Sequence, residues 1–322
     1  MLPDDPLVTI DTIQAEVPTI TVETVEFEGE GDFCRAYTVN GDWLFRFAYN
    51  EEGSRALERE IALLPRLVPT LSLPVPTITY SGRQHRNGFL FVGYPRITGV
   101  PLTFAFLQTL QPTEQEPFAR DLALFLRGLH SFSIEEARVL GVPACEYPFC
   151  RTEDGIIEGS AAELYNRESE RLLNHPLLDR YLDQMTAGRV RTYVGMVVKA
   201  LLHEPKRGDL PLALVHGDLS SEHILFDPTT RRITGIIDFS DAVITTPLLD
   251  FVYLWGAYGP DFSDLLLNHY EVDAGHLVMY RIRYLRRWHV ALRLLWALDH
   301  DYEPGIKNWS LELLSHSDSV AK

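Results

Sequence analysis

The sequence has few cysteines, fewer basic than acidic residues and no long apolar run. Its 322 residues include three cysteines, Cys34, Cys145 and Cys150, which have no zinc-type spacing and are too few for a disulfide framework. We therefore expect free thiols in a reducing compartment. Lys and Arg number 29 against 45 Asp and Glu, and the formal net charge is −16. This excess of acid argues against nucleic acid or an anionic membrane as the main partner, because both need a cationic surface, and it favours a cationic small molecule.

The sequence also lacks segments that direct a chain into or across a membrane. Its first residues, Met-Leu-Pro-Asp-Asp-Pro, have neither the basic region nor the apolar core of a signal peptide. No uninterrupted apolar stretch approaches the roughly 20 residues needed to span a bilayer. The sequence therefore predicts a soluble, cytoplasmic protein, which we expect to be a monomer.

Hydrophobic periodicity changes along the chain and divides it near residue 95. Residues 1–95 contain four strand-like runs, at Thr19–Val25, Ala36–Val39, Trp43–Phe47 and Gly88–Gly93. A helical stretch lies between the third and the fourth, at 51–67, where apolar residues recur at helical spacing. Residues 96–322 are mostly helical, with short β-type runs between 205 and 250. The sequence thus predicts an α+β protein with a small β-rich N-terminal lobe and a larger, mostly helical C-terminal lobe.

The residues with the clearest chemistry lie in Leu214–Asp227 and in the following run, Ile233–Ser240. Two apolar runs frame a polar loop that contains Asp218 and His223, and a third apolar run ends at Asp238. A β-hairpin would bring Asp238 back beside the other two side chains. Such a group suits phosphoryl transfer, in which one carboxylate orients the attacking hydroxyl while others hold a divalent metal against the phosphate oxygens. The alternative is a buried hairpin whose polar loop has no chemical role.

This pattern, His-Gly-Asp-x-x-x-x-His followed downstream by Ile-Asp-Phe, resembles that of the aminoglycoside phosphotransferases, a family with the protein-kinase fold. The resemblance extends over nearly the whole chain and is strongest to the branch that acts on a 2″-hydroxyl; macrolide kinases, which share the His, are near relatives. It implies a two-lobed, kinase-like fold in which Asp218 is the catalytic base, His223 and Asp238 bind Mg²⁺, and ATP or GTP is the phosphoryl donor. Asp250, in Pro-Leu-Leu-Asp-Phe, matches a family position that braces the catalytic loop.

The resemblance also divides the chain by function. Residues 1–95 would form the nucleotide-binding lobe, and residues 96–322 would form the C-terminal lobe. Within the C-terminal lobe, the catalytic core would comprise about 99–135 and 205–260, and the helical acceptor-binding part about 136–204 and 261–315.

His223 stands where many relatives have Asn. Mg²⁺ prefers oxygen ligands, so an imidazole is a poorer ligand than an amide oxygen. His223 either binds the metal through one nitrogen or holds a metal-bound water, and a structural loop histidine is the alternative. We expect contact with the metal.

The nucleotide side is predicted from two segments of the first lobe. In Phe27–Val39, Gly29 and Gly31 lie between strand-like runs, where glycine lets backbone amides approach phosphates. An ordinary hairpin is the alternative. By the resemblance, the Pro95 carbonyl and the Ile97 amide would hydrogen-bond the purine at the junction of the lobes, where a plain linker is the alternative. Adenine and guanine are not distinguished.

The phosphate-binding cation is predicted to be Arg46. Kinase-like enzymes usually have a lysine on this strand, but the first lysine of the chain is Lys199. A guanidinium can bind phosphate oxygens in bidentate fashion. We predict an ion pair between Arg46 and Glu60, which lies on the apolar face of the 51–67 helix, whereas Glu58 points away from that face.

The acceptor site should lie in the helical part of the larger lobe. A polycationic sugar needs several carboxylates near Asp218 and aromatic faces for its rings. The candidates, for each of which an ordinary solvated helix face is the alternative, are Asp241, Asp261, Asp264, Glu271, Asp273, Asp299, Asp301, Glu303, Trp288, Trp296 and Tyr302. A macrolide would need a broad apolar groove and few carboxylates. One helix also carries four cations that oppose a polycation, Arg281, Arg283, Arg286 and Arg287.

Together these features predict an NTP-dependent O-phosphotransferase that modifies a hydroxyl of an aminoglycoside antibiotic and so confers resistance. A kinase of a macrolide or of another small hydroxyl compound is the nearest alternative. The second alternative is a catalytically silent nucleotide-binding regulator with the same fold, because Arg46 and His223 depart from the usual residues.

Overall fold

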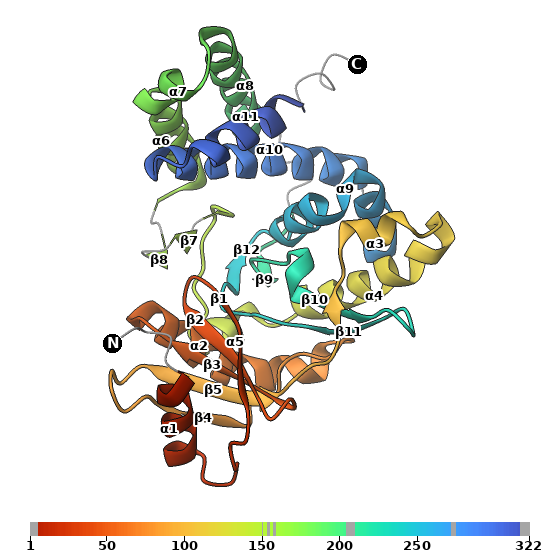
Figure 1. Cartoon of the computed structure of the whole chain (residues 1–322). Coiled ribbons are helices and arrows are strands. Elements are labelled where there is room, and N and C mark those ends of the chain that lie inside the picture. The colour runs from red at the N-terminus through yellow and green to blue at the C-terminus, as the bar shows by residue number, and fades with distance from the viewer. Residues whose placement is uncertain are drawn as a thin grey trace.

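The computed structural model describes residues 6–149, 151–152, 155–156, 159–203, 210–271 and 275–315; Cys150 and Asp273 lie outside them. Figure 1 shows a lobe built on a β-sheet, which contains the N-terminal elements, and a larger region in which helices predominate. The expected α+β arrangement is therefore confirmed. Cys34 and Cys145 are free, as expected, and both are buried. Among the described helices, none has the length and apolar character to cross a membrane.

The N-terminal lobe is an antiparallel sheet of five strands in the order β1-β2-β3-β5-β4. Its elements are α1 (Pro6–Glu16), β1 (Val25–Glu30), β2 (Cys34–Val39), β3 (Trp43–Ala48), α2 (Glu51–Leu67), the short 3₁₀ turn η1 (Val68–Thr70), β4 (Tyr80–Arg83) and β5 (Leu90–Pro95). The strand predicted at Thr19–Val25 is wrong, because β1 begins only at Val25. The amides of Glu23 and Thr24 donate to the side chain of Asn40 instead of to a neighbouring strand.

Alternation along β3 determines which side chains meet α2. Phe45 and Phe47 belong to an aromatic cluster on one face of the sheet, where Ile13 of α1 also packs. The side chain of Arg46 therefore points to the opposite face. Leu57 of α2 packs against that opposite face. β3 therefore places the buried guanidinium of Arg46 against α2, the helix that carries its predicted acidic partner, Glu60.

The larger region contains two small sheets surrounded by helices. The sheets have the strand orders β11-β10-β6 and β12-β9. Their strands are β6 (Val100–Pro101), β9 (Ala213–Val215), β10 (Ile224–Asp227), β11 (Arg232–Ile236) and β12 (Val243–Thr245), and a short hairpin pairs β7 (Arg151–Thr152) with β8 (Gly155–Ile156). The helical elements are α3 (Phe104–Gln108), α4 (Pro112–His130), α5 (Ile134–Val139), α6 (Ala161–Leu173), α7 (Pro176–Tyr181), α8 (Gln184–His203), the 3₁₀ turn η2 (Ser221–His223), α9 (Leu248–Tyr270), α10 (Gly275–Asp299) and α11 (Glu303–Ser315).

Helix α9 consists of two segments that meet at a sharp bend. Gly259 has φ 82° and ψ 178°, and Pro260 follows it; proline has no amide hydrogen to continue the helix. The second segment returns toward the first, so that the ring centroids of Phe251 and Tyr270 are 5.0 Å apart. The Tyr270 hydroxyl lies 2.9 Å from Nδ1 of His130 on α4. Both segments of α9 therefore contact the side chain of His130, the first through Asp250 and the second through Tyr270.

Candidate active site

The loop from His216 to His223, here called the His216–His223 loop, starts where β9 ends and is held from behind by Asp250. The Asp250 side chain is completely buried. Its Oδ2 accepts a hydrogen bond from the His216 amide at 3.0 Å, and its Oδ1 accepts one from the Gly217 amide at 3.1 Å. His130 Nε2 lies 3.0 Å from Oδ2. Asp250, the residue expected to brace this loop, thus binds its backbone directly.

Gly217 is required by the shape of the loop. Its φ is +86°, a conformation that side chains rarely adopt, and a Cβ atom there would lie 2.1 Å from the carbonyl oxygen of Asp241. The close approach places the segment after Asp238 directly against the His216–His223 loop.

His216 links the two halves of the site, and the sequence reasoning assigned it no role. It is fully buried, its Nε2 lies 3.0 Å from the Ile237 carbonyl, and its Nδ1 lies 3.3 Å from the Asp218 amide. Nε2–H donates and Nδ1 accepts in the neutral ring. Burial lowers the pKa of His216, which agrees with that neutral form. The sequence feature that could have indicated this role is the position of His216 as the first residue of the His-Gly-Asp motif.

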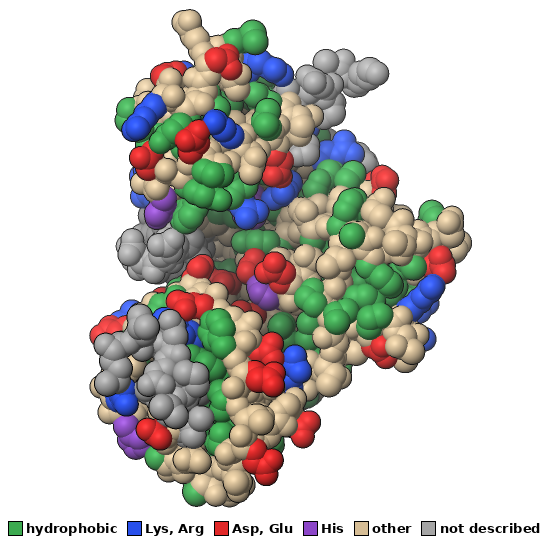
Figure 2. All heavy atoms as spheres, in the orientation of Figure 1, with side chains coloured by type: hydrophobic (Ala, Val, Ile, Leu, Met, Phe, Trp, Pro, Cys, Tyr) green, Lys and Arg blue, Asp and Glu red, His purple; other side chains and the backbone are tan. Residues whose placement is uncertain are grey.

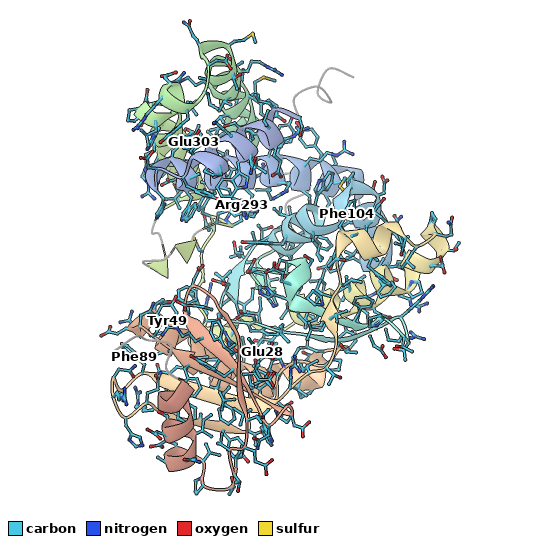
Figure 3. All side chains as sticks on the ribbon, viewed as in Figure 1. Glu28, Tyr49, Phe89, Phe104, Arg293 and Glu303 are labelled. Atoms are coloured by element: carbon cyan, nitrogen blue, oxygen red, sulfur yellow. The ribbon has the colours of Figure 1, made fainter. Side chains whose placement is uncertain are left out.

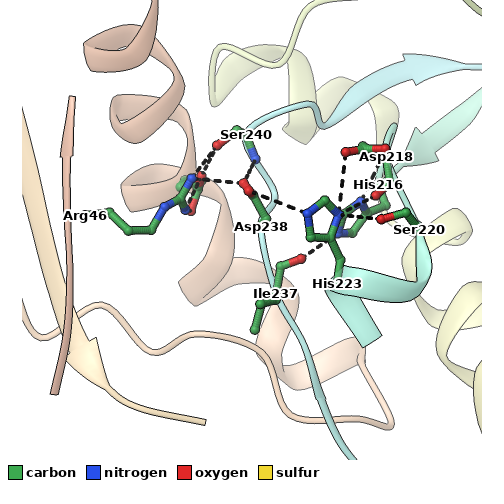
Figure 4. A network of polar contacts seen from close by, with 9 residues as sticks. Arg46, His216, Asp218, Ser220, His223, Ile237, Asp238 and Ser240 are labelled. Atoms are coloured by element: carbon green, nitrogen blue, oxygen red, sulfur yellow. Dashed lines mark hydrogen bonds and ion pairs between the residues drawn. The ribbon is translucent and has the colours of Figure 1, made fainter. Parts of the chain in front are cut away.

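Asp218, His223 and Asp238 come together, as the sequence predicted (Figure 4). His223 Nδ1 lies 2.6 Å from the Asp218 carbonyl oxygen, so this nitrogen carries a proton and donates a hydrogen bond. The other ring nitrogen, Nε2, faces Asp238 Oδ2 at 3.8 Å. Nδ1 is also 3.6 Å from the Asp218 carboxylate. The ring nitrogen Nε2 of His223 and the carboxylate of Asp238 therefore face the same space.

The two carboxylates have opposite electrostatic environments. Burial raises the pKa of Asp218, and His223 offsets part of that shift. Burial would also raise the pKa of Asp238, but the Arg46 guanidinium and His223 outweigh it and hold that pKa well below its usual range. Asp238 stays ionised and has a left-handed backbone, with φ 66°. Asp218 is therefore the better proton acceptor of the two, and Asp238 the permanent anion.

The donor set fits a metal that arrives with phosphates rather than one held by protein alone. In the described ranges, no three or more His, Cys, Asp and Glu side chains are arranged to hold an ion. Mg²⁺ is usually bound by one or two carboxylates and completes its octahedron with phosphates and water. Asp238 supplies such a carboxylate, and Nε2 of His223 lies 3.8 Å from its Oδ2. These two residues therefore fit a nucleotide-bound Mg²⁺.

Arg46 and Glu60 form the predicted ion pair. Arg46 Nη1 donates to both Glu60 oxygens, at 2.9 and 2.8 Å, and Glu60 is fully buried. Arg46 Nη2 reaches across to Asp238 Oδ1 at 2.9 Å and to the Ser240 hydroxyl at 2.6 Å. Glu58 is exposed and pairs with Arg83 instead. A single guanidinium thus connects the sheet, α2 and the segment after β11.

The predicted nucleotide-binding glycines lie at an open edge of the sheet. Gly29 is in β1, where the pairing with β2 shifts register between Phe27 and Gly29, so it is not in a loop as expected. A Cβ atom at Gly29 or Gly31 would meet nothing within 4 Å. The Gly31 carbonyl accepts a hydrogen bond from the Tyr49 hydroxyl at 2.8 Å. Internal packing therefore does not explain these glycines.

The predicted purine-binding residues lie between the sheet and the larger region. β5 ends at Pro95, opposite Trp43, and β6 begins at Val100. Ile97 lies against β11, since a Cβ atom on Gly235 would come 2.9 Å from its side chain. In the part of the chain that the structure describes, the Ile97 amide donates no backbone hydrogen bond. This amide is available to a ligand.

Among the acceptor candidates that the structure describes, Asp241 is the one whose contacts join it to the His216–His223 loop. Asp261, Asp264 and Tyr302 are exposed. Other candidates have partners elsewhere: Glu271 pairs with Arg127 at 2.9 Å, Asp299 with Arg171 at 2.8 Å, Asp301 accepts from Tyr181, and Glu303 pairs with Lys307. Tyr302, in the turn between α10 and α11, packs edge to face on Trp296 of α10.

Trp288 does not fit the predicted contact with an acceptor. It is fully buried, and its indole N–H donates to the Tyr147 hydroxyl at 2.7 Å. Its ring packs edge to face on Tyr165. The expectation was wrong because α10 buries more than one face, so helical spacing alone did not reveal which side chains line a cleft.

Several aromatic and basic side chains lie near the carboxylates. The sequence did not predict that they would contact an acceptor. Burial, followed by the charges of Asp218 and Asp241, raises the pKa of Tyr253. The Tyr253 ring lies 5.0 Å from that of His289, which also has Arg286 Nη1 3.3 Å from its Nδ1. Burial and the neighbouring arginines hold the pKa of His289 well below its usual range.

Arg293 extends this surface toward the sheet lobe. Figure 3 shows it on the side of α10 that faces the lower lobe, and its guanidinium lies 5.0 Å from the centre of the Trp309 ring. In Figure 2, acidic side chains and a histidine gather in the hollow between the two parts, while hydrophobic and basic side chains face them from the helical side. The hollow is therefore acidic on one wall and aromatic and basic on the other.

Comparison with known proteins identifies one family and a common fold. The profile of a family described as "Phosphotransferase enzyme family" matches residues 25–289. The GDP and kanamycin complex of APH(2")-IIia superimposes with a TM-score of 0.82 at 28% identity, covering 97% of this chain and 99% of that one. A macrolide 2'-phosphotransferase type I shares the fold, with a TM-score of 0.65 at 20% identity and coverage of 97% and 98%. "Uncharacterized protein YcbJ" of Bacillus subtilis (strain 168) is 35% identical over 65 residues, 20% of this chain and 21% of that protein.

Proposed function

Because the chain belongs to the phosphotransferase enzyme family, we propose that it transfers the terminal phosphoryl group of ATP or GTP to a hydroxyl of an aminoglycoside. The observation that carries this proposal is the convergence of Asp218, His223 and Asp238 beside the buried Arg46. In the cytoplasm, this modification would inactivate the antibiotic and make the cell resistant. A catalytically silent regulator does not fit, because the family consists of enzymes and both carboxylates are present.

On the donor side, the proposal uses side chains and backbone groups of the sheet lobe. The Nη hydrogens of Arg46 bond Glu60, Asp238 and Ser240, so Arg46 would attract phosphate oxygens through the positive charge of its guanidinium and its remaining Nε–H. Gly29 and Gly31 leave space for the phosphates beside the strand edge. The Pro95 carbonyl accepts from the purine edge, and the Ile97 amide donates to it.

Asp238 and His223 would hold Mg²⁺. When bound, the ion supplies positive charge against the phosphate oxygens, where negative charge develops during transfer. The chain's own contribution is to fix both donors. The hydrogen bond from His223 Nδ1 to the Asp218 carbonyl orients the ring so that Nε2 faces Asp238 and would be the nitrogen that binds the ion.

Asp218 would orient the acceptor hydroxyl and take its proton. The acceptor oxygen forms a bond to the terminal phosphorus, the bond from that phosphorus to the bridging oxygen breaks, and the nucleoside diphosphate leaves with that electron pair. The hydroxyl proton passes to the Asp218 carboxylate, whose raised pKa suits it to receive one. Since the transition state of such transfers is largely dissociative, positioning contributes more than deprotonation.

The aminoglycoside is the proposed acceptor for two reasons. The net charge of −16 and the acidic wall of the hollow would attract a polycation. The structure that is 28% identical to this chain is described as a kanamycin complex. Asp241 is the proposed acceptor contact with the strongest support, because it adjoins the His216–His223 loop.

A macrolide or another small hydroxyl compound is the second candidate, and one observation favours it. The wall that faces the carboxylates carries Tyr253, His289 and Arg293 instead of further acids. Arg293 pairs with no carboxylate among the residues that the structure describes, so it would repel an amino sugar but tolerate a neutral ring system. The two candidates therefore differ in the charge that they bring to Arg293.

Incubation with each acceptor and each nucleotide tests the proposal. Kanamycin and a macrolide would each be combined with ATP or GTP, and the products analysed by mass spectrometry and phosphorus NMR. The proposal expects one phosphoryl group on kanamycin and none with Asp218→Ala. Phosphorylation of the macrolide alone would favour the second candidate, and no phosphorylated product from any combination would reject both.

A further inference from the structure

Ser240 joins segments of the chain that are far apart in sequence. Its hydroxyl accepts a hydrogen bond from Arg46 Nη2 at 2.6 Å and donates one to Glu60 Oε1 at 2.8 Å. Arg46 Nη1 bonds both oxygens of the same glutamate, so the contacts form a closed ring across β3, α2 and the segment after β11 (Figure 4). Ser240, Arg46 and Glu60 are 3%, 7% and 0% exposed.

Ser240 also affects how the two oxygens of Asp238 are used. Oδ1 contacts Arg46 Nη2 at 2.9 Å, and the Ser240 amide donates to the same oxygen at 3.4 Å. Oδ2 faces His223 instead. Arg46 Nη2 thus shares its hydrogens between Asp238 and the Ser240 hydroxyl. Without the hydroxyl, the guanidinium could turn further onto the Asp238 carboxylate and away from any phosphate.

We propose that Ser240 is a positioning residue for phosphoryl transfer. Its hydroxyl fixes the Arg46 guanidinium between Glu60 and Asp238, so that the guanidinium meets the nucleotide phosphates while Asp238 Oδ2 remains available to a metal. The inference rests on the proposed role of Arg46 as a phosphate ligand. This role for Ser240 depends on the arginine on β3. A lysine ammonium has no rigid fork of N–H groups that would be shared among Glu60, Asp238 and Ser240.

Calorimetric titration of the whole protein with ATP, and separately with GTP, in the presence of Mg²⁺ tests this role without an acceptor. Ser240→Ala and Ser240→Cys should weaken nucleotide binding roughly tenfold, because alanine removes and cysteine weakens the two hydrogen bonds that the hydroxyl makes to buried charged groups. Ser240→Thr keeps the hydroxyl and should restore binding to within about twofold of wild type. Ser263→Ala is the matched control, since Ser263 is buried and its hydroxyl bonds the Gly259 carbonyl at 2.9 Å.

A double-mutant cycle with Arg46→Lys separates positioning from a general structural effect. If the hydroxyl acts through the guanidinium, Ser240→Ala should change nucleotide affinity less than about twofold in the Arg46→Lys background. Equal losses in both backgrounds would overturn the inference, as would wild-type affinity in Ser240→Ala and Ser240→Cys. If the alanine variant does not fold, the cysteine and threonine variants decide.

The result also separates this inference from the proposed function. A protein that binds nucleotide with the expected dependence on Ser240, yet phosphorylates no acceptor, would retain the inference and reject the proposed acceptor. A wild-type protein that binds neither nucleotide would overturn both.

Discussion

Replacing Asp250 with Asn should lower both stability and turnover. The two carboxylate oxygens accept hydrogen bonds from the amides of His216 and Gly217, and Oδ2 also contacts His130. Asparagine keeps one acceptor oxygen and presents an NH₂ group to the other amide, so one buried N–H loses its partner. An unsatisfied buried donor costs roughly 1–3 kcal/mol, and the lost negative charge weakens the remaining bonds. We expect the free energy of unfolding to fall by about 3 kcal/mol.

Urea denaturation of Asp250→Asn measures this loss, and Glu271→Gln is the control. Glu271 pairs with Arg127 on the surface at 2.9 Å, so its replacement should cost less than about 1 kcal/mol. The phosphoryl-transfer rate of Asp250→Asn should fall at least about tenfold, because displacement of the His216–His223 loop moves Asp218. A denaturation midpoint equal to that of the control, with an unchanged rate, would refute the bracing role.

Asp218→Ala should abolish phosphoryl transfer while calorimetry still detects nucleotide binding; a rate near wild type would contradict its assignment. Because burial raises the pKa of Asp218 and only the ionised carboxylate accepts a proton, the rate should fall with decreasing pH above the range of an ordinary Asp, and a pH profile that stays flat down to that range would disagree. Gly217→Ala would place a Cβ atom 2.1 Å from the Asp241 carbonyl oxygen, so its melting temperature should drop clearly, and an unchanged value would mean that the loop adapts. Trp288→Phe removes a buried hydrogen bond to Tyr147 and should cost about 1 kcal/mol without altering the acceptor KM; a changed KM would make Trp288 an acceptor contact after all.

The parts of the site that could be predicted from sequence are those that short-range geometry determines. His223 and Asp238 lie on either side of one hairpin, β10–β11, so their approach follows from strand pairing. The Arg46–Glu60 pair follows from two periodicities, since alternation points Arg46 toward α2 and helical spacing puts Glu60 on the inner face. The resemblance to the family indicated the roles of His223 and Asp238, and the geometry of the hairpin indicated that they would lie close together.

Features that depend on long-range packing could not be predicted. Nothing in the local sequence indicates that the Ser240 hydroxyl would meet Glu60, 180 positions away. The burial of Trp288 depends on Tyr147 and Tyr165 from other segments. In the same way, the amides near Thr24 bond a single Asn side chain, which the β-rich composition of that segment does not reveal.

The reversal of α9 at Gly259 makes two distant segments depend on each other. Tyr270, at the far end of the helix, contacts His130, and His130 contacts the aspartate that holds the His216–His223 loop. Fraying of the last turn of α9 would therefore reach the phosphoryl-transfer machinery from its rear, without crossing the ligand-binding hollow. Amide exchange in these two segments should accordingly follow a single opening event, as expected for one cooperative folding unit.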